Sequence, residues 1–134
     1  MSEGVDAIDI PEVKAEVEAV FADYERALTT NDVAALDSFF LAAPTAIRYG
    51  AGENLYGFEE IKAFRAARPS VGLMRKLERT QITTYGRDLA IAATLFRRES
   101  APGKIGRQMQ TWARFPFGWR IVAAHVSIID EPKA

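Results

Sequence analysis

The strongest constraint on the fold of this 134-residue chain lies near its end, where two β-rich runs flank a Pro/Gly break. Residues 106–115 and 119–128 stand on either side of Pro116-Phe117-Gly118, which predicts an antiparallel hairpin with a three-residue turn. The expected register pairs Phe115 with Trp119 and then, away from the turn, Thr111 with Ala123 and Arg107 with Ser127. The hairpin therefore predicts a β-sheet at the C-terminal end of the fold.

The same register fixes which residues share a face, because successive side chains of a strand point to opposite sides of the sheet. One face is apolar near the turn and becomes polar at Arg107, His125 and Ser127. An apolar wall that ends in an Arg, the single His and a Ser is typical of one side of a pocket. We therefore predict that Arg107, His125 and Ser127 bind substrate. For His125 the alternative is a hydrogen-bonded core His.

The opposite face of the hairpin carries Gln108, Gln110 and Trp112 opposite a row of Val and Ala residues. A large aromatic residue on a half-apolar face indicates a subunit interface, so we expect a homodimer joined through the sheet. A register slip of one residue would exchange the two faces.

Composition excludes several classes of function. The chain has 17 Lys and Arg residues against 18 Asp and Glu, so no basic surplus points to nucleic acid. It has no Cys and one His, which excludes thiolate chemistry and argues against a protein-built transition-metal site. We expect no cofactor and no metal. No apolar run approaches the roughly 20 residues of a membrane span, and the acidic N-terminus does not resemble a signal peptide, so we expect a cytoplasmic protein.

The first part of the chain predicts a long helix after a loose lead-in over residues 1–10. Pro11 suits a first helical turn, Asp9 is a candidate cap, and apolar residues at helical spacing extend the helix to about Thr30. Tyr24 lies on this apolar stripe. The pattern alone does not distinguish a core aromatic from a functional Tyr.

A short helix, a short strand over 45–50 and a third helix over Phe58–Arg68 are expected next. Arg48 lies between apolar neighbours of the strand. It is either a surface residue or a pocket Arg that holds a carboxylate or an oxyanion, and we favour the pocket because two helices should cover this strand. Arg65 and Arg68 lie beside core positions of the third helix, where they are either solvated or add positive potential to a pocket.

Long strands over 73–85 and 89–99 precede the hairpin. Helices followed by a meander of antiparallel strands predict an α+β fold. We expect a single domain over residues 1–134, in which a curved antiparallel sheet wraps the first helix as a cone with a pocket at its open end.

These elements and several local motifs resemble one known group. Leu55-Tyr56-Gly57, residues 64–69, Thr83-Thr84-Tyr85-Gly86, residues 106–112 and the Gly118–Ser127 run GWRIVAAHVS resemble the AtzH/HpxZ group of the SnoaL-like, nuclear-transport-factor-like superfamily. The resemblance covers most of the chain. It implies the cone fold.

The resemblance also implies an activity. Proteins of this group are regarded as small amidohydrolases that convert 1,3-dicarboxyurea to allophanate, with release of ammonia and carbon dioxide, in cyanuric acid or oxalurate breakdown. They are linked to an amidase-signature enzyme. The group's catalytic Tyr matches Tyr24 and its catalytic Arg matches Arg48.

A small anionic carboxy-urea needs fixed positive donors more than apolar area. Arg48 can fork onto a carboxylate or stabilise an oxyanion, and Tyr24 can donate its phenolic proton. Arg107 and His125 are then expected to hold the second carboxylate or to orient water. Two alternatives stay open: a ketosteroid-isomerase-like proton-transfer enzyme, and a non-catalytic ligand-binding or accessory protein for the amidase.

Overall fold

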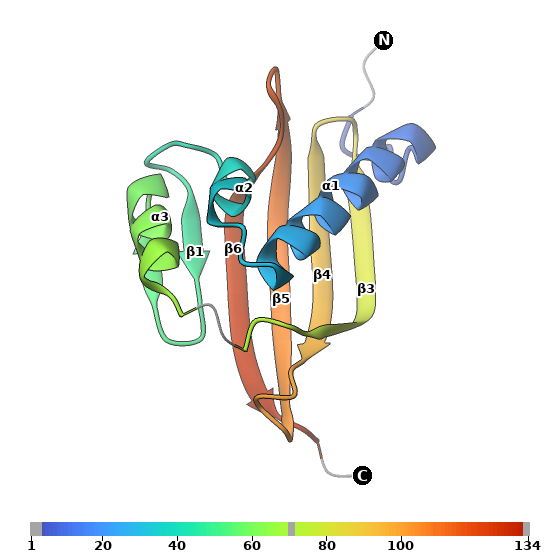
Figure 1. Cartoon of the computed structure of the whole chain (residues 1–134). Helices are drawn as coiled ribbons and strands as arrows, with labels where there is room; N and C mark the ends of the chain where they lie inside the picture. The colour runs from blue at the N-terminus through green and yellow to red at the C-terminus, as the bar shows by residue number, and fades with distance from the viewer. Residues whose placement is uncertain (1–3, 70–71, 133–134) are drawn as a thin grey trace.

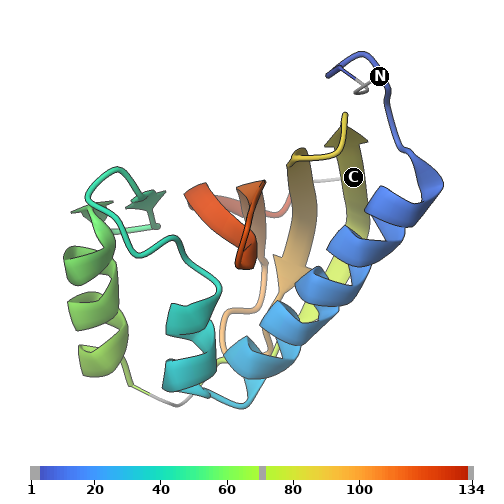
Figure 2. The same ribbon diagram turned by 90° about the horizontal axis from the view of Figure 1, so that it is seen from above.

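The computed structural model describes residues 4–69 and 72–132 and has an α+β fold, as predicted (Figure 1). Three helices cover one face of a curved six-stranded sheet whose strand order is β2-β1-β6-β5-β4-β3 (Figure 2). The strands are antiparallel to their neighbours except that β1 runs parallel to β6. The elements are α1 (Pro11–Thr29), α2 (Val33–Ser38), β1 (Ile47–Tyr49), β2 (Asn54–Tyr56), α3 (Phe58–Ala67), β3 (Lys76–Tyr85), β4 (Leu89–Arg97), β5 (Lys104–Phe115) and β6 (Gly118–Asp130).

Helix α1 lies across the concave face of the sheet because its apolar stripe needs a partner surface. Val13, Val17 and Phe21 on this stripe are buried. Tyr24 continues the stripe and packs edge-on against Trp112 of β5, with ring centroids 6.4 Å apart. The stripe therefore positions the Tyr24 ring over the middle of the sheet.

The segment before α1 is more ordered than the expected loose lead-in. Residues 1–3 lie outside the described residues, but Ile8 forms a β-bridge with Tyr85. The Asp9 amide donates to the Thr84 carbonyl at 3.0 Å, and the Thr84 amide donates to Oδ1 of Asp9 at 2.9 Å. Asp9 therefore attaches the segment to β3 instead of capping α1, whose N-cap is Ile10.

The predicted hairpin is present, and its register is correct only away from the turn. Thr111 pairs with Ala123, and the pairs from there to Arg107 and Ser127 are as expected. Near the turn Phe115 pairs with Gly118 instead of Trp119, because Gly118 has a φ of 116° and already belongs to β6. A bulge next to Thr111 accommodates the difference, as an extra residue in one strand does.

The two faces of the hairpin are opposite to the prediction. Gln108, Gln110 and Trp112 are 3%, 1% and 0% exposed and lie on the concave face beneath the helices. Because this face is covered within the chain, it is not the predicted dimer interface. A homodimer stays a prediction, and it would use the outer face, where Met109 is more than half exposed.

Candidate functional site

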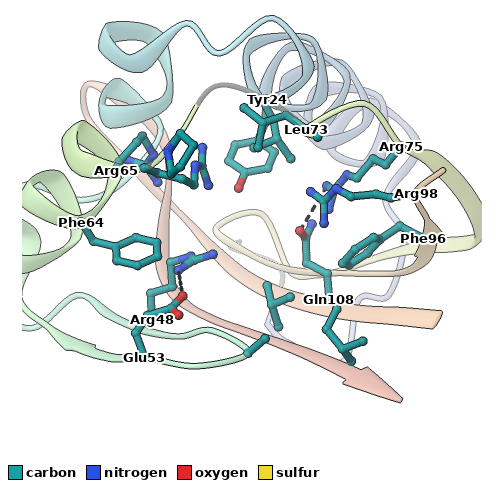
Figure 3. A pocket seen from close by; sticks show the side chains of 17 residues that line it. Tyr24, Arg48, Glu53, Phe64, Arg65, Leu73, Arg75, Phe96, Arg98 and Gln108 are labelled. Carbon is teal, nitrogen blue, oxygen red and sulfur yellow. Dashed lines mark hydrogen bonds and ion pairs between the residues drawn. The ribbon is translucent and has the colours of Figure 1, made fainter. Parts of the chain in front are cut away.

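A cavity of about 380 Å³ lies between the end of α1, α3, β1 and the neighbouring ends of β4 and β5 (Figure 3). Arginines dominate its polar lining. They come from β1, from the C-terminal end of α3, from the segment before β3 and from the residue after β4. The five are Arg48, Arg65, Arg68, Arg75 and Arg98.

Tyr24 presents its hydroxyl to this cavity. Its ring is held edge-on by Phe39 and Trp112, with centroids at 5.9 and 6.4 Å, and the residue is 5% exposed. Figure 3 shows the hydroxyl pointing into the space between Arg48 and Arg98. Within the described part of the chain the hydroxyl has no hydrogen-bond partner, so it is available to a ligand.

Arg48 enters the cavity from β1, and its position depends on a carboxylate. Nη1 of Arg48 donates to Oε1 of Glu53 at 2.9 Å, and both side chains are largely buried. An added Cβ at Gly50 would lie 1.7 Å from Oε1 of Glu53, so Gly50 leaves the room that Glu53 needs. The pair balances the Arg48 charge. No described residue accepts a hydrogen bond from the other N–H groups of Arg48, so they can meet a ligand.

Arg65 lines the cavity, but its charge is already balanced. Nη1 of Arg65 donates to Oδ1 of Asp37 at 2.6 Å, and the Arg65 side chain is 4% exposed. Its guanidinium also lies 4.9 Å from the ring centroid of Phe40. This buried ion pair joins α3 to α2, which makes Arg65 a structural residue of the cavity wall.

Arg75 is also neutralised. Its Nε and Nη2 atoms donate to the two carboxylate oxygens of Glu25 on α1, at 2.8 and 2.6 Å. Nη2 also donates to Oε1 of Gln108 at 3.1 Å. A two-pronged guanidinium–carboxylate pair is geometrically specific, so Glu25 fixes Arg75 and Arg75 fixes the Gln108 amide.

Arg68 and Arg98 differ from the other three, because neither has an ion-pair partner among the described residues. Nε and Nη2 of Arg68 and Nε of Arg98 are buried there without a hydrogen bond. Burial lowers the pKa of Arg68, and the charges of Arg65 and Arg48 lower it further. Burial likewise lowers the pKa of Arg98, together with the charges of Arg75 and Arg68. Both stay positively charged at neutral pH, because the pKa of Arg starts far above it.

The cavity therefore carries two uncompensated positive charges. A buried charge without a counter-ion is costly, and either an anionic ligand or solvent must compensate it. Two guanidinium groups beside one hydroxyl donor are suited to a ligand with two negative charges and several acceptor oxygens.

Four of the seven predicted site residues line this cavity: Tyr24, Arg48, Arg65 and Arg68. The other three are on the outer face. Nε of Arg107 donates to Oγ of Ser127 at 3.1 Å, and the His125 ring lies edge-on to Tyr49 with centroids 6.0 Å apart. Arg107, His125 and Ser127 therefore do not line this cavity, contrary to the prediction, because the hairpin face was assigned to the wrong side of the sheet.

Sequence reasoning missed Glu53, Arg75, Arg98 and Gln108. One usable signal was present for Arg98. Along β4 the even-numbered residues Ala90, Ala92, Thr94 and Phe96 are buried, and the same alternation carried one residue past the strand points Arg98 inward.

In the described part of the chain no group of three His, Asp or Glu residues is placed to hold a metal ion. No described helix combines the length and apolar character that crossing a membrane requires.

Comparison with known proteins places the chain in a family. The AtzH-like family model matches residues 6–132. A crystal structure of a protein of unknown function from Pectobacterium atrosepticum, assigned to the DUF3225 family, is 59% identical with a TM-score of 0.90; the match covers 93% of this chain and 97% of that one. A cystatin-like fold protein from Burkholderia xenovorans is 46% identical with a TM-score of 0.89, over 93% of this chain and 98% of that one.

A more distant match supports the fold alone. A nuclear transport factor 2-like superfamily protein from Salmonella enterica is 24% identical with a TM-score of 0.67, over 92% of this chain and 94% of that one. No functionally curated protein matches the chain. The fold is thus the nuclear-transport-factor-like fold that the sequence predicted, and the chain belongs to the AtzH-like family.

Proposed function

We propose that the protein is an enzyme that cleaves a C–N bond of a small dianionic carboxy-urea, with 1,3-dicarboxyurea as the substrate and allophanate as the product. The observation that carries the proposal is the pair of uncompensated arginines, Arg68 and Arg98, in one cavity with the free hydroxyl of Tyr24. The substrate itself is taken from the family resemblance.

The atoms of substrate and product make the proposed reaction a decarboxylation, without the release of ammonia that the family resemblance implied. 1,3-Dicarboxyurea and allophanate differ by one carbon dioxide, so the conversion consumes a proton and releases no ammonia. The C–N bond to one carboxylate breaks, its electron pair stays on nitrogen, and nitrogen takes a proton. The carboxylate carbon leaves as carbon dioxide.

Tyr24 is suited to supply that proton, because its hydroxyl faces the cavity without a protein partner among the described residues. Arg48 orients the reacting end with its free N–H groups. Arg68 adds positive charge that favours the phenolate left on Tyr24, which water then reprotonates.

A ketosteroid-isomerase-like mechanism fits this cavity less well. That chemistry uses a carboxylate as the base, beside an oxyanion hole made of a Tyr and a second, protonated carboxylic acid. Glu53 is the one acidic residue among the described side chains that line the cavity, and Arg48 engages it. No described carboxylate in the cavity lining is left to shuttle a proton.

The test is release of carbon dioxide from freshly prepared 1,3-dicarboxyurea by the purified protein, followed by ¹³C NMR against the rate in buffer. Tyr24→Phe removes one hydroxyl and should lower the rate by roughly a hundredfold or more. It should change the free energy of unfolding by about 1 kcal/mol or less, because the hydroxyl has no described protein partner.

Arg48→Lys keeps the charge and loses the planar fork, so its rate should also fall steeply. Wild-type protein that does not exceed the rate in buffer would refute the enzyme proposal and favour the accessory-protein alternative. Variants that fold and keep normal turnover would refute the roles given to Tyr24 and Arg48.

A further inference from the structure

We propose that Arg98 and Gln108 form a distal carboxylate site, which binds the carboxylate that the substrate keeps. The assignment of the kept carboxylate rests on the proposed function. The anion site itself rests on the geometry of these two side chains.

Gln108 is the first part of the distal carboxylate site. It is 3% exposed and lines the cavity, and its Nε2 has no hydrogen-bond partner among the described residues. Its orientation is fixed chemically. Arg75 can only donate, so the amide oxygen must face Nη2 of Arg75, at 3.1 Å. The NH₂ group is therefore a buried donor that a ligand oxygen can satisfy.

Arg98 is the second part. Its guanidinium lies 4.8 Å from the centroid of Phe96, and that of Arg75 lies 4.6 Å from the same centroid. Arg75 is neutralised by Glu25, whereas no described carboxylate pairs with Arg98. Arg98 thus brings an uncompensated charge to the same side of the cavity as the Gln108 amide (Figure 3).

The distal carboxylate site lies across the cavity from Arg48 and Glu53, with the Tyr24 hydroxyl between them (Figure 3). A ligand with a carboxylate at each end can therefore meet donors at both ends. The two ends differ in their donors. Arg48 is paired with Glu53 and has the unpaired Arg68 near it, whereas the distal end combines the unpaired Arg98 with the unpaired Gln108 amide.

This asymmetry favours one direction of binding. The carboxylate that leaves as carbon dioxide loses its negative charge in the reaction, so a set of donors that binds it tightly would oppose the step. The phenolate left on Tyr24 is instead stabilised by the charge of Arg68. The carboxylate that stays keeps its charge throughout, so Arg98 can bind it in both the ground state and the transition state. We therefore place the reacting end at Tyr24 and Arg48.

Calorimetric titration with glutarate tests the distal carboxylate site without any reaction. Glutarate separates its two carboxylate carbons by three atoms, as 1,3-dicarboxyurea does, and glutaramate keeps this length with one negative charge fewer. Wild-type protein should bind glutarate roughly ten- to a hundredfold more tightly than glutaramate, the range for a charge-assisted hydrogen bond.

Arg98→Gln should reduce that preference to about threefold or less. Gln108→Glu should have the same effect, because its carboxylate would occupy the space between Arg75 and Arg98. Arg107→Gln is the matched control, since Arg107 adjoins Gln108 in sequence but lies on the outer face, and it should keep the wild-type preference. Arg98→Gln removes a buried uncompensated charge, so it should fold with a melting temperature at or above that of wild type.

Equal binding of the two probes by wild type, binding of neither, or a wild-type preference in Arg98→Gln or Gln108→Glu would overturn the distal carboxylate site. The decarboxylation assay reports separately on the proposed function. If Arg98→Gln loses the preference for glutarate but the wild-type protein never releases carbon dioxide, the distal carboxylate site is supported and the proposed function is refuted. If the wild-type protein releases carbon dioxide but Arg98→Gln keeps the preference for glutarate, the proposed function is supported and the distal carboxylate site is refuted.

Discussion

Replacing Gly106 with alanine should destabilise the protein through one ring, that of Phe96. The two residues are cross-strand partners on β5 and β4. An ideal Cβ at Gly106 would lie 2.0 Å from Cζ of Phe96 and 2.2 and 2.3 Å from its two Cε atoms. Phe96 is 2% exposed and is flanked by the guanidinium groups of Arg75 and Arg98, so the ring has little room to move.

Overpacking of this kind costs about 1–3 kcal/mol. Unfolding entropy near the melting point is about 2.1 cal/mol/K per residue, or roughly 0.28 kcal/mol/K for 134 residues. The melting temperature should therefore fall by about 4–11 °C. Because Phe96 supports Arg98, Gly106→Ala should also weaken glutarate binding.

Differential scanning calorimetry checks the shift, with Gly52→Ala as the matched control. No described atom lies within 4 Å of a Cβ added at Gly52, so that variant should stay within about 0.5 kcal/mol of wild type. Adding Phe96→Leu to Gly106→Ala removes the ring atoms that clash. The double variant should therefore be more stable than the sum of the single changes. Equal melting temperatures for Gly106→Ala and Gly52→Ala would refute the reasoning.

Two further variants test the ion pairs that frame the cavity. Asp37→Asn leaves the buried Arg65 without its carboxylate and should cost about 3–5 kcal/mol in urea unfolding; a loss under about 1 kcal/mol would show that solvent replaces the pair. Glu25→Gln frees Arg75 in the same way, so it should destabilise the protein in dilute buffer and recover part of the loss when sulfate is added. A variant that sulfate does not stabilise more than wild type would contradict a cavity that gathers anions.

The order of helices and strands could be predicted from the sequence, because each element is defined by residues that are close together in the chain. Pro11, the helical spacing up to Tyr24 and the break after Phe115 each depend on a few neighbouring residues. The inward positions of Tyr24 and Arg48 have the same basis, since the apolar stripe and the short strand set their directions. The catalytic roles given to both residues stay proposals. The family resemblance pointed to the same two residues.

The partners of Arg48 and Arg75 could not be predicted in this way. Glu53 reaches Arg48 because the chain turns at Gly50, and Glu25 reaches Arg75 across 50 positions of sequence. Such pairings are decided by packing between elements. Only the structure therefore separates neutralised arginines from uncompensated ones.

The error over the hairpin faces has a physical cause that bears on function. The more apolar face of a strand is ordinarily the buried one, yet β5 turns Gln108, Gln110 and Trp112 inward and leaves Met109 outside. Burying amides in place of a thioether is unfavourable unless each amide finds a partner. A fold that nevertheless buries these amides uses polar groups on its concave face. This departure from the usual pattern therefore indicates a ligand cavity.

The two buried glutamines show where that cavity is. Oε1 of Gln110 accepts from Nε1 of Trp112 at 3.0 Å, and Gln110 leaves no buried side-chain atom unpaired in the described structure. Gln108, two residues earlier on the same face, has its oxygen held by Arg75 and its NH₂ group unpaired. Two glutamines on one face of β5 thus differ: Gln108 has a buried donor without a partner among the described residues, whereas Gln110 has no such buried atom. An amide needed only for packing has no reason to stay unsatisfied at 3% exposure, which is why the glutarate preference should depend on Gln108 and Arg98 together.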